Sequence, residues 1–245
     1  MRASVYAAVW AVVAAVLVAP PPAVSQTGTL RGTVRVEGVV PPPRAIEVTK
    51  NQEFCGEKID ATDVLVDQGK LAFAVVYVNG LSDEAAPSEY LLSNSGCTFD
   101  PPVLATAVGG TLLVDNQDEV LHNTHLKLAR GSSHRTVGNW ALSSKGVQIS
   151  SDRPLRRAGF IEVSCDAHPW MHATIWIFDH PFFAVSNEDG AFEIPGLPVG
   201  THTLTVWHEI LGELETDVTV RADATTSIEL VYSSAESATR QEGRE

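Results

Sequence analysis

"VSCDAHPWMHATIWIF" occupies residues 163–178 and holds the most specific pattern in this chain of 245 residues. Cys165, His168 and Met171 follow one another at three-residue steps, at the end of one strand-like run and just before another. Thiolate, imidazole and thioether groups are soft or borderline donors for metal ions. A short loop that carries all three indicates a metal site, to which another part of the chain must add ligands.

The missing ligand is expected upstream, in "VGGTLLVDNQDEVLHNTHL" at residues 108–126. A strand through Leu112 and Val114 leads into a polar corner and then to His122. Together the two segments supply two imidazoles, one thiolate and one thioether. Two histidines and a cysteine in a trigonal arrangement, with a weak axial methionine, form the blue-copper electron-transfer site.

These segments resemble the cupredoxin family of blue copper proteins, most of all its amicyanin/plastocyanin-like members. The similar stretches are "FDPPVLATAVGGTLLVDNQDEVLHNTH" and "CDAHPWM", and the resemblance covers roughly residues 95–178. It implies a Greek-key β-sandwich with one type 1 copper. It also implies that Asn123, directly after the first histidine, ties the two ligand loops together, as outer hydrogen bonds do at metal sites. The implied copper ligands are His122, Cys165, His168 and Met171.

Other histidines lie near the motif, and any of them could replace a ligand. We interpret them as surface or hydrogen-bonded side chains, because histidine is a common, partly exposed residue. His125 follows His122 by three positions, so on a strand it would point to the opposite face. The functions of His125, His134, His172 and His208 stay open on the sequence alone.

The whole chain has an all-β pattern, in which short β-rich runs alternate with Gly, Pro, Asn and Asp. "AVSNEDGAFEIPGLPVGTHTLTVWH" (184–208) resembles the carboxypeptidase regulatory-like or transthyretin-like sandwich, and "LRGTVRVEG" (30–38) resembles the opening strand of such modules. The cupredoxin segment is therefore hypothesised to be inserted within this second sandwich, with Trp207 packing where the modules meet. The expected division is an N-terminal β segment at 28–92, the cupredoxin domain at 93–179, the second sandwich at 180–232 and a disordered tail at 233–245.

Residues 1–25 have the pattern of a secretory signal peptide: Arg2, an apolar run and a small-x-small site at Ala23–Ser25. An uncleaved anchor is the alternative, although the apolar run is short for a span of about 20 residues. No cysteine follows the cleavage signal, so a lipoprotein anchor is not expected. The predicted location is periplasmic or secreted, with no membrane span after cleavage.

Export changes the interpretation of the three cysteines, Cys55, Cys97 and Cys165. In an oxidising compartment two of them can pair and one remains. Cys165 belongs to the metal motif, so a disulfide between Cys55 and Cys97 is predicted. The alternative is three unpaired thiols.

The formal net charge of −13 argues against electrostatic binding of nucleic acid or an anionic membrane. The leading prediction is a periplasmic type 1 copper protein that carries single electrons to and from an unidentified redox protein. The alternatives are a copper chaperone or sensor, and a zinc-binding structural module. An enzyme is not expected: the chain has no His-x-His pair of the kind multicopper oxidases need, and Cys165 with His168 is poorly placed as a thiol hydrolase.

Overall fold

The structure is a computed structural model that describes residues 26–38, 40, 44–61, 64–86, 88–131 and 133–233. Within these residues the fold is built almost wholly from β-strands, in agreement with the all-β prediction. The predicted signal peptide at 1–25 lies outside the described residues, and so does the predicted tail at 233–245 except for Ser233, which ends the strand Thr225–Ser233. No helix in the described part of the chain is long and apolar enough to cross a membrane.

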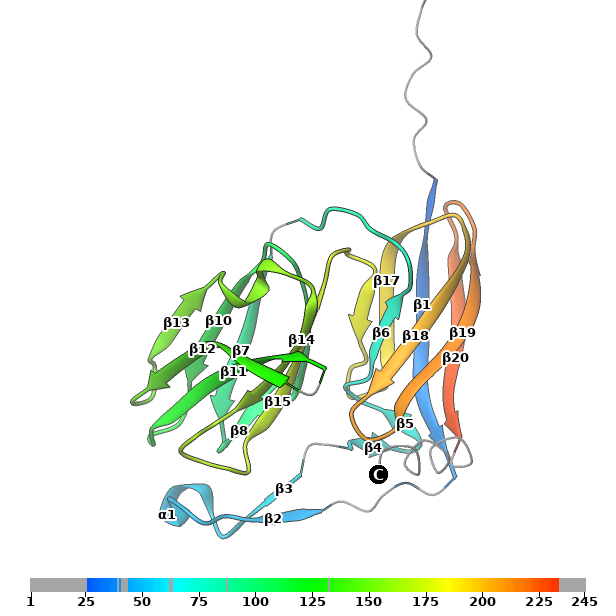
Figure 1. Ribbon diagram of the computed structural model, residues 1–245. Helices are drawn as coiled ribbons and strands as arrows, with labels where there is room; N and C mark the ends of the chain where they lie inside the picture. Colours follow the sequence, from blue (N-terminus) through cyan, green and yellow to red (C-terminus); the bar gives the residue numbers. More distant parts are fainter. Residues whose placement is uncertain are drawn as a thin grey trace, which may run out of the picture.

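One sandwich is formed by strands from both ends of the chain, and we call it the host sandwich (Figure 1). In its first sheet β1 is central: it pairs antiparallel with β17 and parallel with β20. Gly32 allows this close packing, because a Cβ there would lie 2.5 Å from the Ile228 carbonyl oxygen and 2.6 Å from the Phe192 ring. Its strands are β1 (Thr27–Glu37), β4 (Val66–Asp67), β5 (Lys70–Leu71), β6 (Val75–Val78), β16 (Phe183–Val185), β17 (Ala191–Pro198), β18 (Gly200–His208), β19 (Gly212–Val220) and β20 (Thr225–Ser233).

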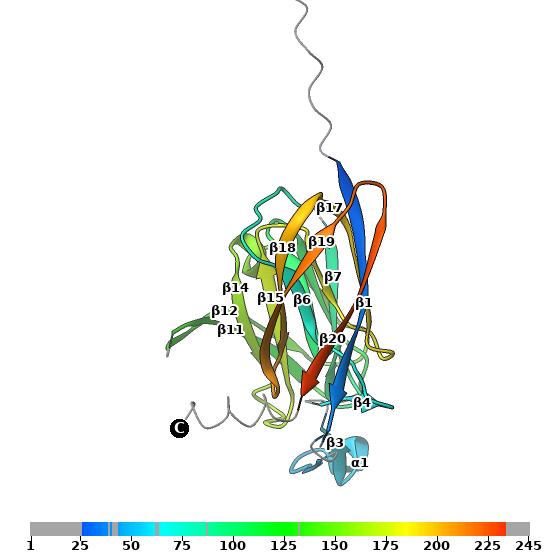
Figure 2. The same cartoon turned by 90° about the vertical axis from the view of Figure 1, so that its right-hand side faces the viewer.

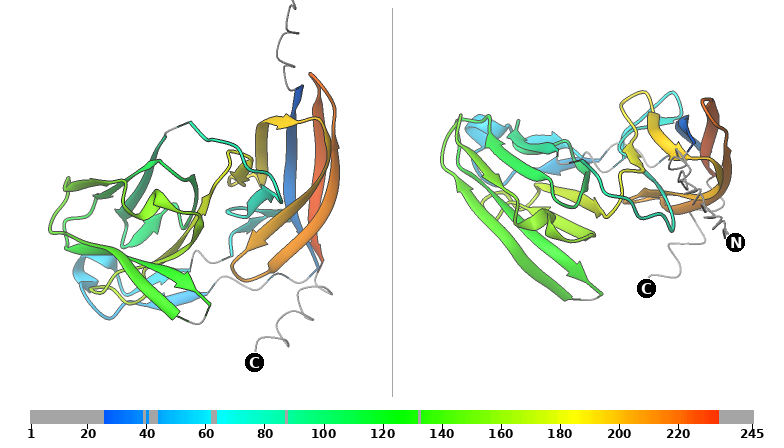
Figure 3. Two further views of the ribbon diagram at one scale, coloured as in Figure 1. Left: turned by 45° about the horizontal axis from the view of Figure 1, so that its top comes forward. Right: turned by 90° about the horizontal axis from the view of Figure 1, so that it is seen from above.

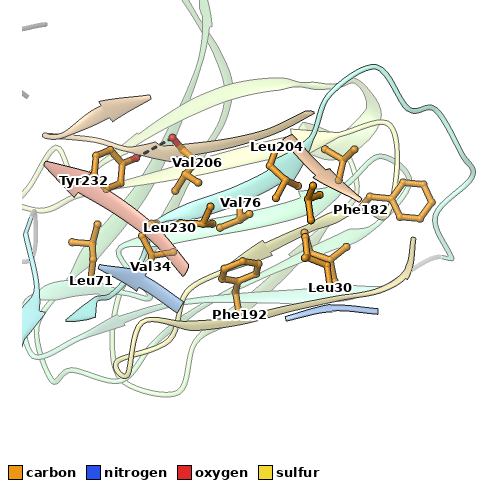
Figure 4. Packing of buried hydrophobic residues seen from close by; sticks show 14 of the residues in the cluster. Leu30, Val34, Leu71, Val76, Phe182, Phe192, Leu204, Val206, Leu230 and Tyr232 are labelled. Atoms are coloured by element: carbon orange, nitrogen blue, oxygen red, sulfur yellow. Dashed lines mark hydrogen bonds between the residues drawn. The ribbon is translucent and has the colours of Figure 1, made fainter. Parts of the chain in front are cut away.

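The host core lies between the sheet around β1 and the sheet of order β16-β6-β18-β19. Figure 4 shows Leu30, Val76, Leu204 and Leu230 meeting there from four strands, and Tyr232 Oη donates a 2.9 Å hydrogen bond to the Val206 carbonyl. Each such aliphatic side chain stabilises the fold by roughly 1.5–3 kcal/mol on full burial. This core joins residues 30–36 to residues 192–232, so the two chain ends form one unit.

Between the N-terminal and C-terminal parts that form the host sandwich, the chain forms a second, separate pair of sheets. We call this pair the inserted module (Figure 3). One sheet has the order β13-β10-β7-β8 and the other the order β12-β11-β14-β15-β9, and they enclose their own core. Its elements are β7 (Glu89–Ser95), β8 (Thr98–Asp100), β9 (Val103–Ala107), β10 (Thr111–Asn116), β11 (His122–Arg130), β12 (Ser133–Leu142), β13 (Gln148–Ser151), η1 (Pro154–Arg156), β14 (Gly159–Ser164) and β15 (His172–Phe178).

The start of the inserted module differs from the expected boundary at residue 93. β7 begins at Glu89 and pairs in parallel with β10, so residues 89–92 belong to the module's first sheet. The stretch "DEAAPSEYLLS" (residues 83–93) has a composition compatible with a short helix or a loop, but its second half forms this strand. Leu92 is fully buried while Leu91 is exposed, which is the alternation of a half-buried strand.

The two modules share a small aromatic interface that β6 makes possible. Successive strand side chains point to opposite faces, and Val76 and Val78 enter the host core while Val75 and Tyr77 face the inserted module. Trp207 confirms its predicted place here, with its ring centroid 5.4 Å from that of Trp176.

Residues 44–61, from the N-terminal part of the chain, lie at the far end of the inserted module, and we call them the cap segment. It contains β2 (Ala45–Glu47), the single helical turn α1 (Gln52–Cys55) and β3 (Lys58–Asp60). Figures 1 and 2 show it below the β-sheets, apart from the host core. A disulfide between Cys55 and Cys97, with a Cα–Cα distance of 5.7 Å, fastens it to the inserted module.

Candidate metal centre

The candidate ligands come from two places that sheet pairing brings together. β14 ends at Ser164 and β15 begins at His172, and these two residues are paired, so residues 165–171 form the connecting hairpin loop. β11 pairs antiparallel with β14, with His125 opposite Ser164. His122, three residues earlier on β11, therefore lies at the same end of the sheet as the loop.

Three donor atoms converge at this end. The ligand atoms of His122, Cys165 and His168 all lie within 4.8 Å of one another. The Nδ1 atoms of the two imidazoles are 2.9 Å apart, and Cys165 Sγ is 3.7 Å from His168 Nδ1. Both histidines are fully buried and the thiol is nearly so, which separates the cluster from solvent.

Met171 closes the same loop. Its backbone N–H donates to the His168 carbonyl at 3.0 Å, and its own carbonyl accepts the Cys165 N–H at 3.4 Å. The side chain is 2% exposed and lies in the core of the inserted module. The loop and the start of β11 thus place all four predicted residues in one buried region.

Asn123 connects the two ligand-bearing segments. Its side-chain Oδ1 accepts the backbone N–H of Asp166 at 2.7 Å and that of Ala167 at 3.3 Å. Its own backbone N–H points at Cys165 Sγ at 3.4 Å. One residue therefore holds the hairpin loop against β11, which is the tie that the resemblance implies, and its backbone N–H also donates to the sulfur.

The outer edge of each imidazole is held by an oxygen, and the sequence did not reveal these partners. His122 Nε2 lies 2.9 Å from Asp118 Oδ2, and His168 Nε2 lies 2.9 Å from Asn51 Oδ1. A carboxylate oxygen or an amide oxygen accepts a hydrogen bond, so each Nε2 carries the ring N–H. Each Nδ1 then carries a lone pair, and the two lone pairs face each other across 2.9 Å.

Burial keeps both imidazoles neutral. Desolvation lowers the pKa of His168 to about 4, with a further contribution from the nearby His122. Desolvation also lowers the pKa of His122, against the opposing effect of Asp118, whose hydrogen bond and charge favour the protonated ring. Neutral imidazole is the form that binds metal.

The remaining histidines lie outside the cluster. His125 contacts Asp166 through Nδ1 and Thr136 through Nε2. His134 lies 3.0 Å from a Glu162 carboxylate oxygen. His172 Nε2 lies 4.0 Å from Glu209, across the boundary between the two modules. His208 is buried in the host sandwich, where its Nδ1 accepts the N–H groups of Ile210 and Leu211.

No family model matches the chain, and no curated protein matches it. Solved structures that are similar to it include the purple cupredoxin from Nitrosopumilus maritimus, at 20% identity over 36% of this chain and 98% of that one, with a TM-score of 0.31. Auracyanin A, the blue copper protein of Chloroflexus aurantiacus, is 15% identical over 38% of this chain and 100% of that one, with a TM-score of 0.32. A reduced amicyanin variant is 18% identical over 42% of this chain and 98% of that one, with a TM-score of 0.32.

A copper-containing nitrite reductase from Thermus scotoductus also matches, at 20% identity and a TM-score of 0.31, over 41% of this chain. The chain spans only 24% of that enzyme's length. At these identities and TM-scores the likeness by itself assigns no function. The reason to consider a metal is the set of donor atoms that the fold brings together: one buried thiol and two neutral imidazoles.

Proposed function

We propose that this protein is a type 1 copper protein that carries single electrons outside the cytoplasm, with His122, Cys165, His168 and Met171 as the ligands. The observation that carries this proposal is the pair of Nδ1 lone pairs facing each other at 2.9 Å beside a buried sulfur. Two lone pairs at that distance repel unless a cation lies near both. The low pKa of His168 opposes a proton in that position, and a soft metal ion suits the donors.

Copper supplies one-electron chemistry when it is bound, and the donor set fits both of its oxidation states. The thiolate of Cys165 stabilises Cu(I), imidazoles suit both states, and the thioether of Met171 tunes the potential. Asn123 and the two outer oxygens hold the ligand side chains from behind. A set of ligands held in this way moves little between oxidation states, which favours rapid electron transfer.

His168 offers a path from this site to the surface. Its Nε2 donates to Asn51, an exposed residue of the cap segment, so one hydrogen bond joins the buried ring to the outside. We propose that the redox partner is a protein that docks near Asn51. With a net charge of −13 on this chain, a basic partner is favoured.

The test is the visible spectrum of the purified protein loaded with Cu(II). An intense blue or green band that ascorbate bleaches, and that returns on reoxidation, is the expected result. Copper binding without an intense thiolate band would contradict a type 1 site. A bleached protein that does not return on reoxidation would instead support the chaperone or sensor alternative.

Zinc is the second candidate, and the contact between His122 and Asp118 favours it. A carboxylate behind a histidine ligand is a common arrangement at zinc sites. Two histidines and one cysteine would bind zinc, but Met171 would then have no function as a ligand. Competition of equimolar Cu(I) and Zn(II) for the apo-protein, read by metal analysis, separates the two candidates.

The host sandwich resembles carboxypeptidase regulatory-like or transthyretin-like modules in its sequence pattern, and we propose that it has this type of fold. Support comes from the tight turn at Asn187–Gly190, where Gly190 has a φ of +69° and its N–H donates to the Asn187 carbonyl. In the same sandwich, β1 from the N-terminal part of the chain pairs in parallel with β20 from the C-terminal part. An experimental structure of the module, compared with solved transthyretin-like domains, would decide this assignment.

A further inference from the structure

Each of the two oxygens behind the imidazoles is connected to one end of the disulfide. On one side, Asp118 is 4% exposed, and its carboxylate accepts the backbone N–H groups of Gly96 and Cys97, each at 2.8 Å. The same carboxylate holds His122 Nε2 at 2.9 Å. The position of His122 is therefore linked to the backbone of Cys97 through one carboxylate.

On the other side, Asn51 precedes the single turn of α1 that ends at Cys55. The Asn51 carbonyl accepts the N–H of Phe54 at 2.9 Å and that of Cys55 at 2.8 Å. Its side-chain oxygen holds His168 Nε2 at 2.9 Å. The position of His168 is therefore linked to Cys55 through one helical turn.

The geometry points to a closed ring of contacts, and we propose that it acts as an outer clamp on the metal site. The ring runs from His122 through Asp118 and Cys97 to the disulfide, and returns through Cys55 and Asn51 to His168. In this clamp the disulfide and its two neighbours, Asn51 and Asp118, are positioning residues that fix the spacing of the two Nδ1 atoms. The role of the clamp at a metal site rests on the proposed function. The contacts that form the clamp belong to the protein without metal.

The Asp118 half of the clamp has more contacts that do not depend on the disulfide than the Asn51 half has. Asp118 keeps its place without the disulfide, since its own N–H also donates to Asn116 Oδ1 at 2.8 Å and its carboxylate binds two backbone N–H groups. Asn51 belongs to a cap segment whose only regular elements are α1 and the two-stranded pair β2–β3. Loss of the disulfide should therefore release His168 more than His122.

The first test uses apo-protein, so that its result does not depend on copper. NMR of the ring nitrogens and exchange of the Nε2 protons with solvent are measured for both histidines. The double variant Cys55→Ser/Cys97→Ser should show at least about tenfold faster Nε2–H exchange at His168 and a smaller change at His122. Equal changes at the two rings, which general loosening would produce, or no change at either, would overturn the clamp.

A single variant tests Asn51 without disturbing the disulfide. Asn51 has a φ of +54°, a conformation that glycine and aspartate tolerate better than alanine. Asn51→Gly should expose the His168 Nε2–H, whereas Asn51→Asp keeps an acceptor oxygen and should restore slow exchange. Gln52→Ala is the matched control, because Gln52 lies on the same turn and its side chain donates to the Val48 carbonyl, away from both rings.

The second test measures copper. Outer partners of metal ligands typically contribute about 10–100-fold to metal affinity, so Asn51→Gly and Asp118→Asn should each lose copper to a chelator faster by that order, with Gln52→Ala unchanged. Wild-type rates in Asn51→Gly and Asp118→Asn would count against the clamp. If wild-type protein bound no copper, the proposed function would fail, and the apo-protein ring signals would still decide the clamp.

Discussion

Both modules bury histidines, but they use them in opposite ways. His208 at the end of β18 and His180 in the connection before β16 turn Nδ1 towards nearby backbone N–H groups and accept from them. His122 and His168 of the inserted module have Nε2 bound to side-chain oxygens, and their Nδ1 atoms face each other. In His208 and His180 the Nδ1 lone pair accepts backbone N–H groups of residues that follow closely in the chain. In His122 and His168 the Nδ1 lone pair is directed into a shared site.

Burial alone does not distinguish these uses. Desolvation lowers the pKa of His180 as it lowers the pKa of His122. The difference lies in where Nδ1 points: towards backbone N–H groups in His180 and His208, and towards the other ring in His122 and His168. A buried histidine therefore indicates a ligand only when its free lone pair converges with other donors.

The largest expected effect is on Cys165. Cys165→Ser should abolish the intense colour of the copper-loaded protein, because the thiolate is the source of the charge-transfer band in blue-copper sites. The visible spectrum and a far-UV measurement of folding, taken together, check this result. A folded serine variant that keeps the colour would remove Cys165 from the site.

The disulfide connects the cap segment to the inserted module, and its loss should cost stability. Its two cysteines are 42 residues apart. In the chain-entropy model a loop of this size contributes roughly 3–4 kcal/mol to the free energy of unfolding. Urea denaturation of Cys55→Ser/Cys97→Ser measures this cost. Thiol titration of denatured, unreduced wild-type protein should find one free thiol, and three would contradict the pairing.

The contrast between the two kinds of histidine is tested at His208. His208→Ala should leave the copper spectrum unchanged but lower the free energy of unfolding by about 1–3 kcal/mol, since the N–H groups of Ile210 and Leu211 lose their acceptor. His168→Ala should do the reverse and remove the colour. A loss of colour in His208→Ala would break the comparison.

The stability of the apo-protein should depend on pH through His168. Its pKa is about 4 in the folded protein and near the ordinary 6.5 in the unfolded chain, so the unfolded state binds more protons between these values. The stabilisation is therefore complete above pH 6.5 and is lost as the pH falls towards 4, by on the order of 1–3 kcal/mol. Denaturation curves across this range should show a shallower slope for His168→Gln, and an unchanged slope would exclude His168 as the cause.

The smallest effect is expected at Met171. Met171→Leu should keep copper and colour but raise the reduction potential, because a weak thioether ligand would favour Cu(II) and its loss would favour Cu(I). Leucine has a similar volume, so the cost in stability should stay below about 1.5 kcal/mol. Voltammetry measures the potential, and an unchanged value would show that Met171 is only a core residue.

The sequence by itself determined the local features of this protein. The three-residue steps from Cys165 to His168 and Met171 are fixed along one short loop, so covalent geometry alone keeps these donors close. Short β-rich runs between turn residues predicted an all-β chain, with one strand before the loop and another after it. The hairpin strand β12 has no such signal, because its residues are mostly polar and exposed and show little alternation of burial.

Only the tertiary structure decided how the site is enclosed. Asn51 and His168 are separated by 117 positions, and their contact depends on the cap segment crossing to the far end of the inserted module. Asp118 lies close to His122 in sequence, but its second function, binding the backbone of Cys97, requires β7, β8 and β11 to pack together. Such partners depend on which surfaces meet when two cores form, and a linear pattern of residue types carries no record of that packing.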